Sequence, residues 1–192
     1  MKEKKEKKKW GLIFFIVIIM IGTSFSFVFF GFSPASEDTV YNGIKFTRFP
    51  DRWEAKINGK VAAFSFLPAE VEKIILLENA SNKLQNKLEI DATSDLNSSQ
   101  KESIALAQHQ MGLTLANYNI YVRKGFTANN TFSLPIIKCS AASSIVPVVY
   151  FRQENQTRIY SENNCVVAEA PSAAEMIKVK DRLLYAILGV MK

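Results

Sequence analysis

A long apolar run near the N-terminus is the strongest pattern in this chain. Residues 11–32 are 22 successive positions without a charged side chain. As a helix rising about 1.5 Å per residue they extend roughly 33 Å, enough to cross a hydrocarbon core of about 30 Å. Six Lys and two Glu lie in residues 1–10, and such positive flanks stay in the cytoplasm. The pattern predicts a cytoplasmic basic tail (1–10), a transmembrane helix (11–32) and a linker (33–39), with cleavage after the helix as the alternative to a permanent anchor.

The next part of the chain has the alternating pattern of β-strands. Residues 53–57 alternate apolar and charged side chains, and Asn58-Gly59 supplies a strong hairpin signal. A two-residue turn places Trp53 opposite Phe64 on the buried face. With one more strand before it, this hairpin predicts an antiparallel β meander at the start of an extracytoplasmic α+β domain (40–192).

Strand and helix patterns alternate in the rest of the domain. Residues 87–93 alternate as a strand, apolar side chains recur at helical spacing from Ile104 to Tyr118, and a strand pattern follows at 119–122. This order predicts a right-handed βαβ unit with a parallel pair of strands. Further strands are expected at 134–139, 146–151, 157–160 and 165–168, and a final helix after Pro171-Ser172.

The final helix is apolar around most of its circumference. A narrow polar stripe runs through Lys178, Arg182, Tyr185 and Lys192. A helix of this kind must be covered by something apolar. Burial against the sheet, a homodimer formed through the C-terminal helix, and a second membrane association are the three explanations, although the last has too few apolar residues to span a bilayer.

The charge distribution argues against one class of partner. The chain carries 24 Lys+Arg and 18 Asp+Glu, a formal net charge of +6. Residues 1–10 contribute +4 of this, from six Lys and two Glu, and +2 remains for the rest. Nucleic-acid binding requires clustered Lys and Arg on one face. The expected partners are therefore the lipid bilayer and another protein of the cell envelope, with no nucleic acid.

The predicted orientation places the domain outside the cytoplasm, where disulfides persist. Cys139 and Cys165 are the two cysteines and neither belongs to a CxxC motif, so the even count predicts one disulfide. Two buried free thiols, or a redox or nucleophilic cysteine, are the alternatives. Four N-x-S/T sequons are candidate glycosylation sites on the same outer side. These sequons begin at Asn79, Asn97, Asn129 and Asn155.

The sequence contains no familiar catalytic motif. Because GxSxG, HExxH, Walker A and GxGxxG are all absent, no catalytic, cofactor-binding or metal-binding residue is assigned and no cofactor is expected. His109, the single histidine, has no Cys or carboxylate motif at ligand spacing and is interpreted as a structural or surface residue. An enzyme without a recognisable motif would have to combine scattered residues such as Asp91, Asp95 and Asp181.

From Lys87 onward the predicted elements run β, α, β, an insertion, a β hairpin and a helix. Within this order, a polar turn follows the segment Val146-Pro147-Val148-Val149-Tyr150-Phe151. This order resembles the thioredoxin fold, and the segment is similar to that family's Pro-initiated third strand, which implies a cis Pro147. Where that family places CxxC, this chain has Asp95-Leu96-Asn97-Ser98-Ser99. The resemblance therefore implies a thioredoxin-like βαβ-ββα arrangement without thiol-disulfide oxidoreductase activity.

Two segments carry a second resemblance. They resemble a group of uncharacterised archaeal proteins with one N-terminal membrane helix. The first segment is Tyr41-Asn42-Gly43-Ile44-Lys45-Phe46, and the second is the ending Asp181-Arg182-Leu183-Leu184-Tyr185, continuing to Gly189-Val190-Met191. That resemblance implies an envelope location and no specific activity. Lys9-Trp10-Gly11-Leu12 is also similar to a type IV pilin leader, although Ile16 stands where such helices generally carry Glu.

The function expected from these patterns is a membrane-anchored, extracytoplasmic binding or organising protein of the cell envelope that catalyses no reaction. Its location is predicted to be the cell membrane, with one pass and a cytoplasmic N-terminus. An enzyme without a recognisable motif and a pilin-like filament subunit are the alternatives.

Overall fold

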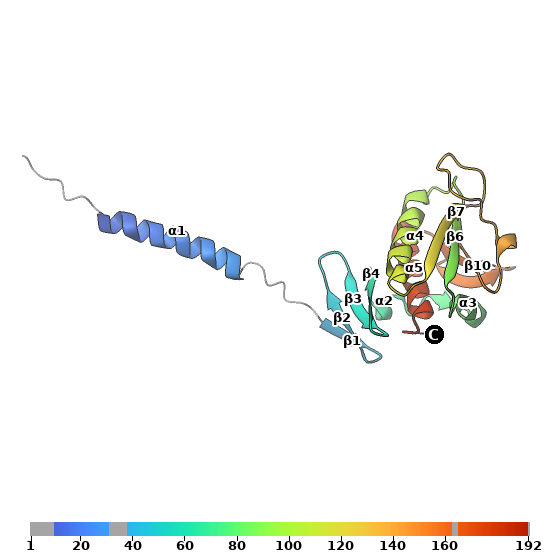
Figure 1. The fold of residues 1–192 in the computed structure, drawn as a ribbon, viewed down its shortest axis with the longest axis horizontal. Coiled ribbons are helices and arrows are strands. Elements are labelled where there is room, and N and C mark those ends of the chain that lie inside the picture. The colour runs from blue at the N-terminus through green and yellow to red at the C-terminus, as the bar shows by residue number, and fades with distance from the viewer. Residues whose placement is uncertain (1–9, 31–37, 163–164, 192) are drawn as a thin grey trace, which may run out of the picture. The chain divides into compact units, whose positions relative to one another are not determined.

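The computed structural model describes residues 10–30, 38–162 and 165–191. They belong to two compact units, 1–37 and 38–192. The first unit contains the helix α1 (Trp10–Phe30). The second contains all the other elements, coloured from light blue to red in Figure 1.

The prediction of a transmembrane helix at 11–32 is wrong for the part of the chain that the structure describes. Among these residues no helix combines the length and the apolar character needed to cross a bilayer. The predicted tail and linker fall almost entirely outside the described residues; α1 begins at Trp10 and the first strand at Asp38.

The predicted antiparallel meander is confirmed at the start of the second unit. Its four strands pair in the order β1-β2-β3-β4. They are β1 (Asp38–Tyr41), β2 (Ile44–Arg48), β3 (Trp53–Ile57) and β4 (Lys60–Phe64). Trp53 lies opposite Phe64 as expected, because Asn58 and Gly59 both take positive φ values, 49° and 81°, and close a two-residue turn. Both rings are buried.

A six-stranded sheet forms the larger part of the domain. Its order is β5-β9-β10-β8-β6-β7. The strands are β5 (Ile75–Leu76), β6 (Glu89–Ser94), β7 (Tyr121–Phe126), β8 (Val148–Gln153), β9 (Arg158–Glu162) and β10 (Cys165–Ala170). The helices are α2 (Pro68–Val71), α3 (Glu78–Leu84), α4 (Lys101–Ala116) and α5 (Ala173–Ile187), with the 3-10 turn η1 (Cys139–Ala141). β6, α4 and β7 form the predicted βαβ unit, with the two strands parallel.

The thioredoxin-like arrangement is wrong, although the α+β class holds. β8 pairs in parallel with β10, and β9 pairs antiparallel with the far side of β10. Strands that are adjacent in sequence, β8 and β9, are therefore separated by the strand that comes after them. The described residues contain no cis peptide bond, so the cis conformation inferred for Pro147 is also wrong.

The two faces of the six-stranded sheet have different covers. On the helix face, α4 and α5 pack side by side against the strands (Figure 1), and the main core includes Val149 and Phe151 from β8. On the opposite face, here called the disulfide face, Val148 and Val167 form a smaller cluster with Ile137. Alternation along β8 produces this division, since successive side chains point to opposite faces.

The final helix is buried against the domain itself. Ser172 caps α5 by accepting a hydrogen bond from the Glu175 backbone N–H at 3.3 Å, and the helix packs against α2, α4 and β10. Two residues of the stripe predicted to be polar are inside, since Arg182 and Tyr185 are 4% and 0% exposed. Burial therefore accounts for the apolar circumference of this helix, and the homodimer through it stays a prediction.

Candidate functional site

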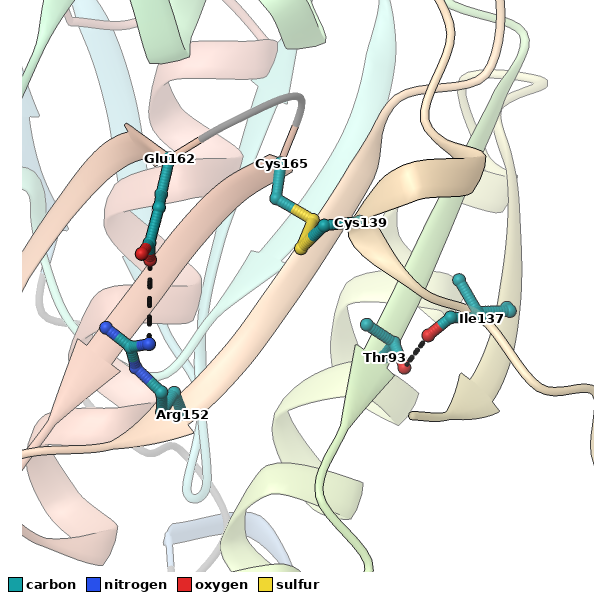
Figure 2. Close-up of a disulfide and its surroundings, with 6 residues drawn as sticks. All are labelled: Thr93, Ile137, Cys139, Arg152, Glu162 and Cys165. Carbon is teal, nitrogen blue, oxygen red and sulfur yellow. Dashed lines mark hydrogen bonds and ion pairs between the residues drawn. A yellow bond between two sulfur atoms is a disulfide. The ribbon is translucent and has the colours of Figure 1, made fainter. Parts of the chain in front are cut away.

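A disulfide fastens a long connection across the disulfide face. Cys139 and Cys165 are bonded, with Cα atoms 5.0 Å apart, which confirms the predicted pairing. The crossing segment (135–142) leads from the edge of β7 to this bond, and Thr93 Oγ1 on β6 donates a hydrogen bond to the Ile137 carbonyl oxygen at 2.8 Å on the way (Figure 2). Within this segment the expected strand at 134–139 is reduced to a single bridge between Ile136 and Phe126.

Gly125 allows the crossing segment to lie directly on β7. A Cβ atom at this position would stand 2.4 Å from the Pro135 carbonyl oxygen and 2.7 Å from the Ile137 side chain. Any other residue would therefore push the segment away from the sheet. Together, Gly125, Thr93 and the disulfide hold the chain that follows the loop after β7.

The loop before the crossing segment closes one side of a cavity at the carboxyl ends of β6 and β7, here called the edge cavity. Its volume is about 710 Å³. Its apolar wall is made by Leu96, Ala105, Phe126, Phe132 and Leu134. The rings of Phe126 and Phe132 lie 5.9 Å apart between centroids. Ser94 and Phe126, the last residues of β6 and β7, both line it.

A few polar side chains converge on the same cavity. Lys101 and Glu102 come from the first turn of α4, Gln108 from its middle, and Lys124 from β7. Gln108 is 5% exposed, and within the described chain its Nε2 has no hydrogen-bond partner. A buried donor left without an acceptor costs about 1–3 kcal/mol.

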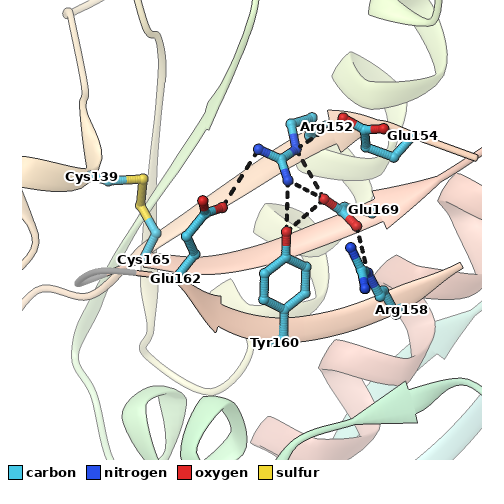
Figure 3. Close-up of polar contacts among 8 residues, drawn as sticks. All are labelled: Cys139, Arg152, Glu154, Arg158, Tyr160, Glu162, Cys165 and Glu169. Atoms are coloured by element: carbon cyan, nitrogen blue, oxygen red, sulfur yellow. Dashed lines mark hydrogen bonds and ion pairs between the residues drawn. A yellow bond between two sulfur atoms is a disulfide. The ribbon is translucent and has the colours of Figure 1, made fainter. Parts of the chain in front are cut away.

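A second polar cluster lies on the disulfide face. Its residues come from β8, β9 and β10, near the carboxyl ends of β8 and β10. Glu169 is fully buried. Its Oε1 accepts hydrogen bonds from Arg152 and from the Tyr160 hydroxyl, the latter at 2.7 Å, and its Oε2 accepts one from Arg158 at 2.8 Å (Figure 3). Glu162 and Glu154 on the rim pair with Arg152 at 3.5 and 3.7 Å.

The protonation states in this cluster fit a structural role. Burial raises the pKa of Glu169, but the hydrogen bonds from Arg158, Tyr160 and Arg152 outweigh it and hold the pKa below its usual value. Burial and then the hydrogen bond to Glu169 raise the pKa of Tyr160 to about 12. Both oxygens of the carboxylate accept hydrogen bonds within the cluster, and these bonds favour its charged form. We interpret the cluster as the tie between β8, β9 and β10.

Replacing Glu169 with glutamine is expected to lower the free energy of unfolding by about 2 kcal/mol at pH 7, because a neutral amide weakens hydrogen bonds to two guanidinium groups. The folded-state pKa of Glu169 is lowered, so its stabilisation is present above the unfolded value near 4.5 and disappears as the pH falls through the folded value. Urea denaturation at pH 7 and pH 3 should show the difference between the two proteins shrinking at the lower pH. Glu162→Gln, on the exposed rim, is the matched control, and an equal effect of both variants would contradict the structural role.

The carboxylates considered for an enzyme without a motif do not converge. Asp91 is held by Arg123 through two hydrogen bonds of 2.7 Å on the disulfide face. Asp181 lies in α5 on the helix face, where its Oδ2 accepts hydrogen bonds from the Ser65 and Phe66 backbone N–H groups. Asp95 lies at the exposed start of the β6–α4 loop. Within the described residues no group of three His, Cys, Asp or Glu could hold a metal ion.

The remaining residues singled out in the sequence are on the surface. His109 is exposed on α4, and the four sequon asparagines are exposed as well. These are Asn79, Asn97, Asn129 and Asn155. Asn97 also lines the edge cavity, so a glycan attached there would stand beside its opening.

The sequence did not predict the edge cavity, because most of its polar residues belong to no motif. One signal was present: Ile104, Gln108, Met111 and Leu115 recur at the spacing of a buried helical stripe, and the glutamine is the polar exception in it. Lys124 and the loop residues Phe132 and Leu134 have no such signal, since the fold alone brings them to α4. Comparison with models of protein families, with curated proteins and with solved structures finds no match.

Proposed function

We propose that residues 38–192 are a binding domain that works outside the cytoplasm and takes its ligand in the edge cavity without transforming it. The observation that carries the proposal is the edge cavity itself, with an aromatic and aliphatic wall and a few polar groups that converge on it. This combination is typical of sites for small ligands, whose volumes run from about 300 to 1,000 Å³.

The polar groups at the cavity favour binding over catalysis. The lining contains neither His nor Cys, and its carboxylate, Glu102, is exposed in the first turn of α4. General acid–base or nucleophilic chemistry needs a pair of groups in mutual contact, one of them activated by the other. The donors at this cavity instead orient a ligand.

The disulfide supports the placement outside the cytoplasm. Such bonds persist in oxidising compartments, and this one fastens the crossing segment that follows Phe132 and Leu134 in the cavity wall. The exposed sequons agree with that compartment. A component of the cell envelope therefore remains the partner we propose.

Filling the cavity should weaken binding of an apolar probe. Ala105 lines the cavity and is exposed, so Ala105→Trp places an indole in the binding space without disturbing the core. We expect decan-1-ol, titrated into the oxidised full chain and followed by calorimetry, to bind one saturable site, with at least about a tenfold loss of affinity in this variant.

Leu106→Trp is the matched control for this experiment. Leu106 is the next residue of α4, is 48% exposed and is not part of the cavity wall, so its variant should bind decan-1-ol as the unaltered chain does. Equal affinity in Ala105→Trp, or no saturable binding at all, would overturn the proposed function.

A further inference from the structure

The unpartnered amide of Gln108 favours one feature in a ligand of the edge cavity. Nε2 of this side chain is buried and has no acceptor within the described chain, while the residue itself lines the cavity. Buried polar groups in native proteins are nearly always satisfied by protein, water or a bound molecule. A ligand that brings an oxygen atom to this position would supply the missing acceptor.

The charges at the cavity favour an anionic oxygen. Lys101 and Lys124 both line it, and neither forms an ion pair within the described residues. Glu102 is the single acidic side chain of the lining, so the lysines leave a net positive charge. Because Lys124 is half-buried, its attraction for an anion is screened less than that of a fully exposed lysine.

The other walls define the body of the ligand. Phe126 and Phe132 present two rings, and Leu96 and Leu134 add aliphatic surface. An aliphatic chain or an aromatic ring gains about 25 cal/mol for each Å2 of apolar surface that these walls remove from water. The ligand is therefore amphipathic, with its apolar part against the phenylalanines and its charged end toward Gln108.

We propose that the edge cavity binds a monocarboxylate with an acyl or aromatic body, an inference that rests on the proposed binding function. One oxygen of the carboxylate accepts a hydrogen bond from Gln108, and Lys101 and Lys124 balance its charge. A phosphate would need more donors, usually arginine side chains or several backbone N–H groups, and the lining contains no arginine. A carboxylate needs fewer hydrogen-bond donors than a phosphate, and one amide and two lysines can supply them.

The head group of a ten-carbon chain provides the test. Decanoate, decan-1-ol and decylamine are titrated below their micelle concentrations into the oxidised full chain by calorimetry. Decanoate should bind about tenfold more tightly than decan-1-ol, and decylamine more weakly than either, because charge-assisted hydrogen bonds to the carboxylate exceed those to a hydroxyl.

Variants of Gln108 separate a binding role from a structural one. Gln108→Leu should lower decanoate affinity about tenfold, leave decan-1-ol affinity nearly unchanged, and raise the melting temperature, since an unsatisfied donor is removed. Gln108→Glu should reverse the order of decanoate and decylamine. Gln110→Leu is the matched control: Gln110 lies on the other flank of α4 beside Ser65, and its variant should keep the order of the three probes.

The outcomes distinguish this inference from the function on which it rests. Equal binding of decanoate and decan-1-ol, with both lost in Ala105→Trp, would overturn the carboxylate and leave the binding domain standing. Failure of every probe to bind would overturn both. A Gln108→Leu variant that keeps the preference for decanoate, or that loses stability, would show that the amide serves packing and would overturn its assigned role.

Discussion

Replacing Asp181 with alanine is expected to lower the free energy of unfolding by about 3–5 kcal/mol, the usual cost of breaking a buried ion pair. Asp181 is 0% exposed and Lys180, whose Nζ donates to its Oδ1 at 2.5 Å, is 1% exposed. The alanine would leave this ammonium group without its partner. It would also leave the backbone N–H groups of Ser65 and Phe66 without the carboxylate oxygen that both contact at 2.9 Å.

The position of Asp181 explains why its loss would reach beyond α5. Ser65 and Phe66 follow β4 directly, and the Tyr185 hydroxyl donates to the Phe66 carbonyl oxygen at 2.6 Å. One turn of α5 therefore holds the connection between the meander and α2. Urea denaturation followed by circular dichroism measures the change. Asp51→Ala, on an exposed side chain that pairs with Arg52, is the matched control and should change stability by less than about 0.5 kcal/mol.

A double variant shows which part of the cost is electrostatic. Lys180→Met combined with Asp181→Asn removes both charges and keeps one oxygen for the Ser65 and Phe66 N–H groups. Because buried ion pairs can be replaced by neutral groups at little cost, this double variant should be more stable than Asp181→Ala alone. A single Asp181→Ala variant within about 1 kcal/mol of the unaltered chain would contradict the assigned role.

The pH dependence of the same residue has the opposite sign to that of Glu169. Burial raises the pKa of Asp181, and the attraction and hydrogen bond of Lys180 offset this in part. A raised folded-state pKa means that the contribution of this carboxyl is greatest below its unfolded value and declines as the pH rises through the folded value. The pKa of Glu169 is lowered instead, so the contribution of Glu169 to stability declines as the pH falls.

Local patterns predicted the parts of the fold that depend on neighbours in sequence. The Asn58-Gly59 turn determines the register of β3 and β4 because two residues in left-handed conformations leave a single pairing. The β6–α4–β7 unit follows from a change of periodicity that needs no information from elsewhere in the chain. These elements were correct in type and order, although β7 runs Tyr121–Phe126 and not 119–122, and Leu88, before β6, is exposed.

Long-range pairing could not be predicted in the same way. β10 lies between β8 and β9, and nothing in the alternation of these three strands states which two will pair. The apolar run at 11–32 was interpreted from its length, its lack of charge and its basic flank, whereas among the described residues no helix is long and apolar enough to cross a bilayer. The edge cavity depends on a loop that folds back onto α4, so residues about 30 positions apart meet there without a shared motif.

Breaking the disulfide is the second change with a large expected effect. Cys139→Ser combined with Cys165→Ser should lower the free energy of unfolding by about 3.5 kcal/mol in the chain-entropy model, for cysteines 26 residues apart. The unfolded chain gains the conformations that the covalent loop excludes. Cys165 is also fully buried, and a serine hydroxyl there adds a desolvation cost. Urea denaturation of the oxidised chain and of the double variant measures the sum.

The same variant tests whether the disulfide serves the edge cavity as well as the fold. Thr93 and Gly125 still hold the crossing segment near β6 and β7, so the wall formed by Phe132 and Leu134 should loosen without leaving the sheet, and decan-1-ol should bind several-fold more weakly. Dithiothreitol should reproduce both effects in the unaltered chain and change nothing in the double variant, which has no sulfur to reduce at these positions. Lost stability with unchanged probe affinity would assign the disulfide to the fold alone, because a wall that keeps its shape without the bond does not depend on it.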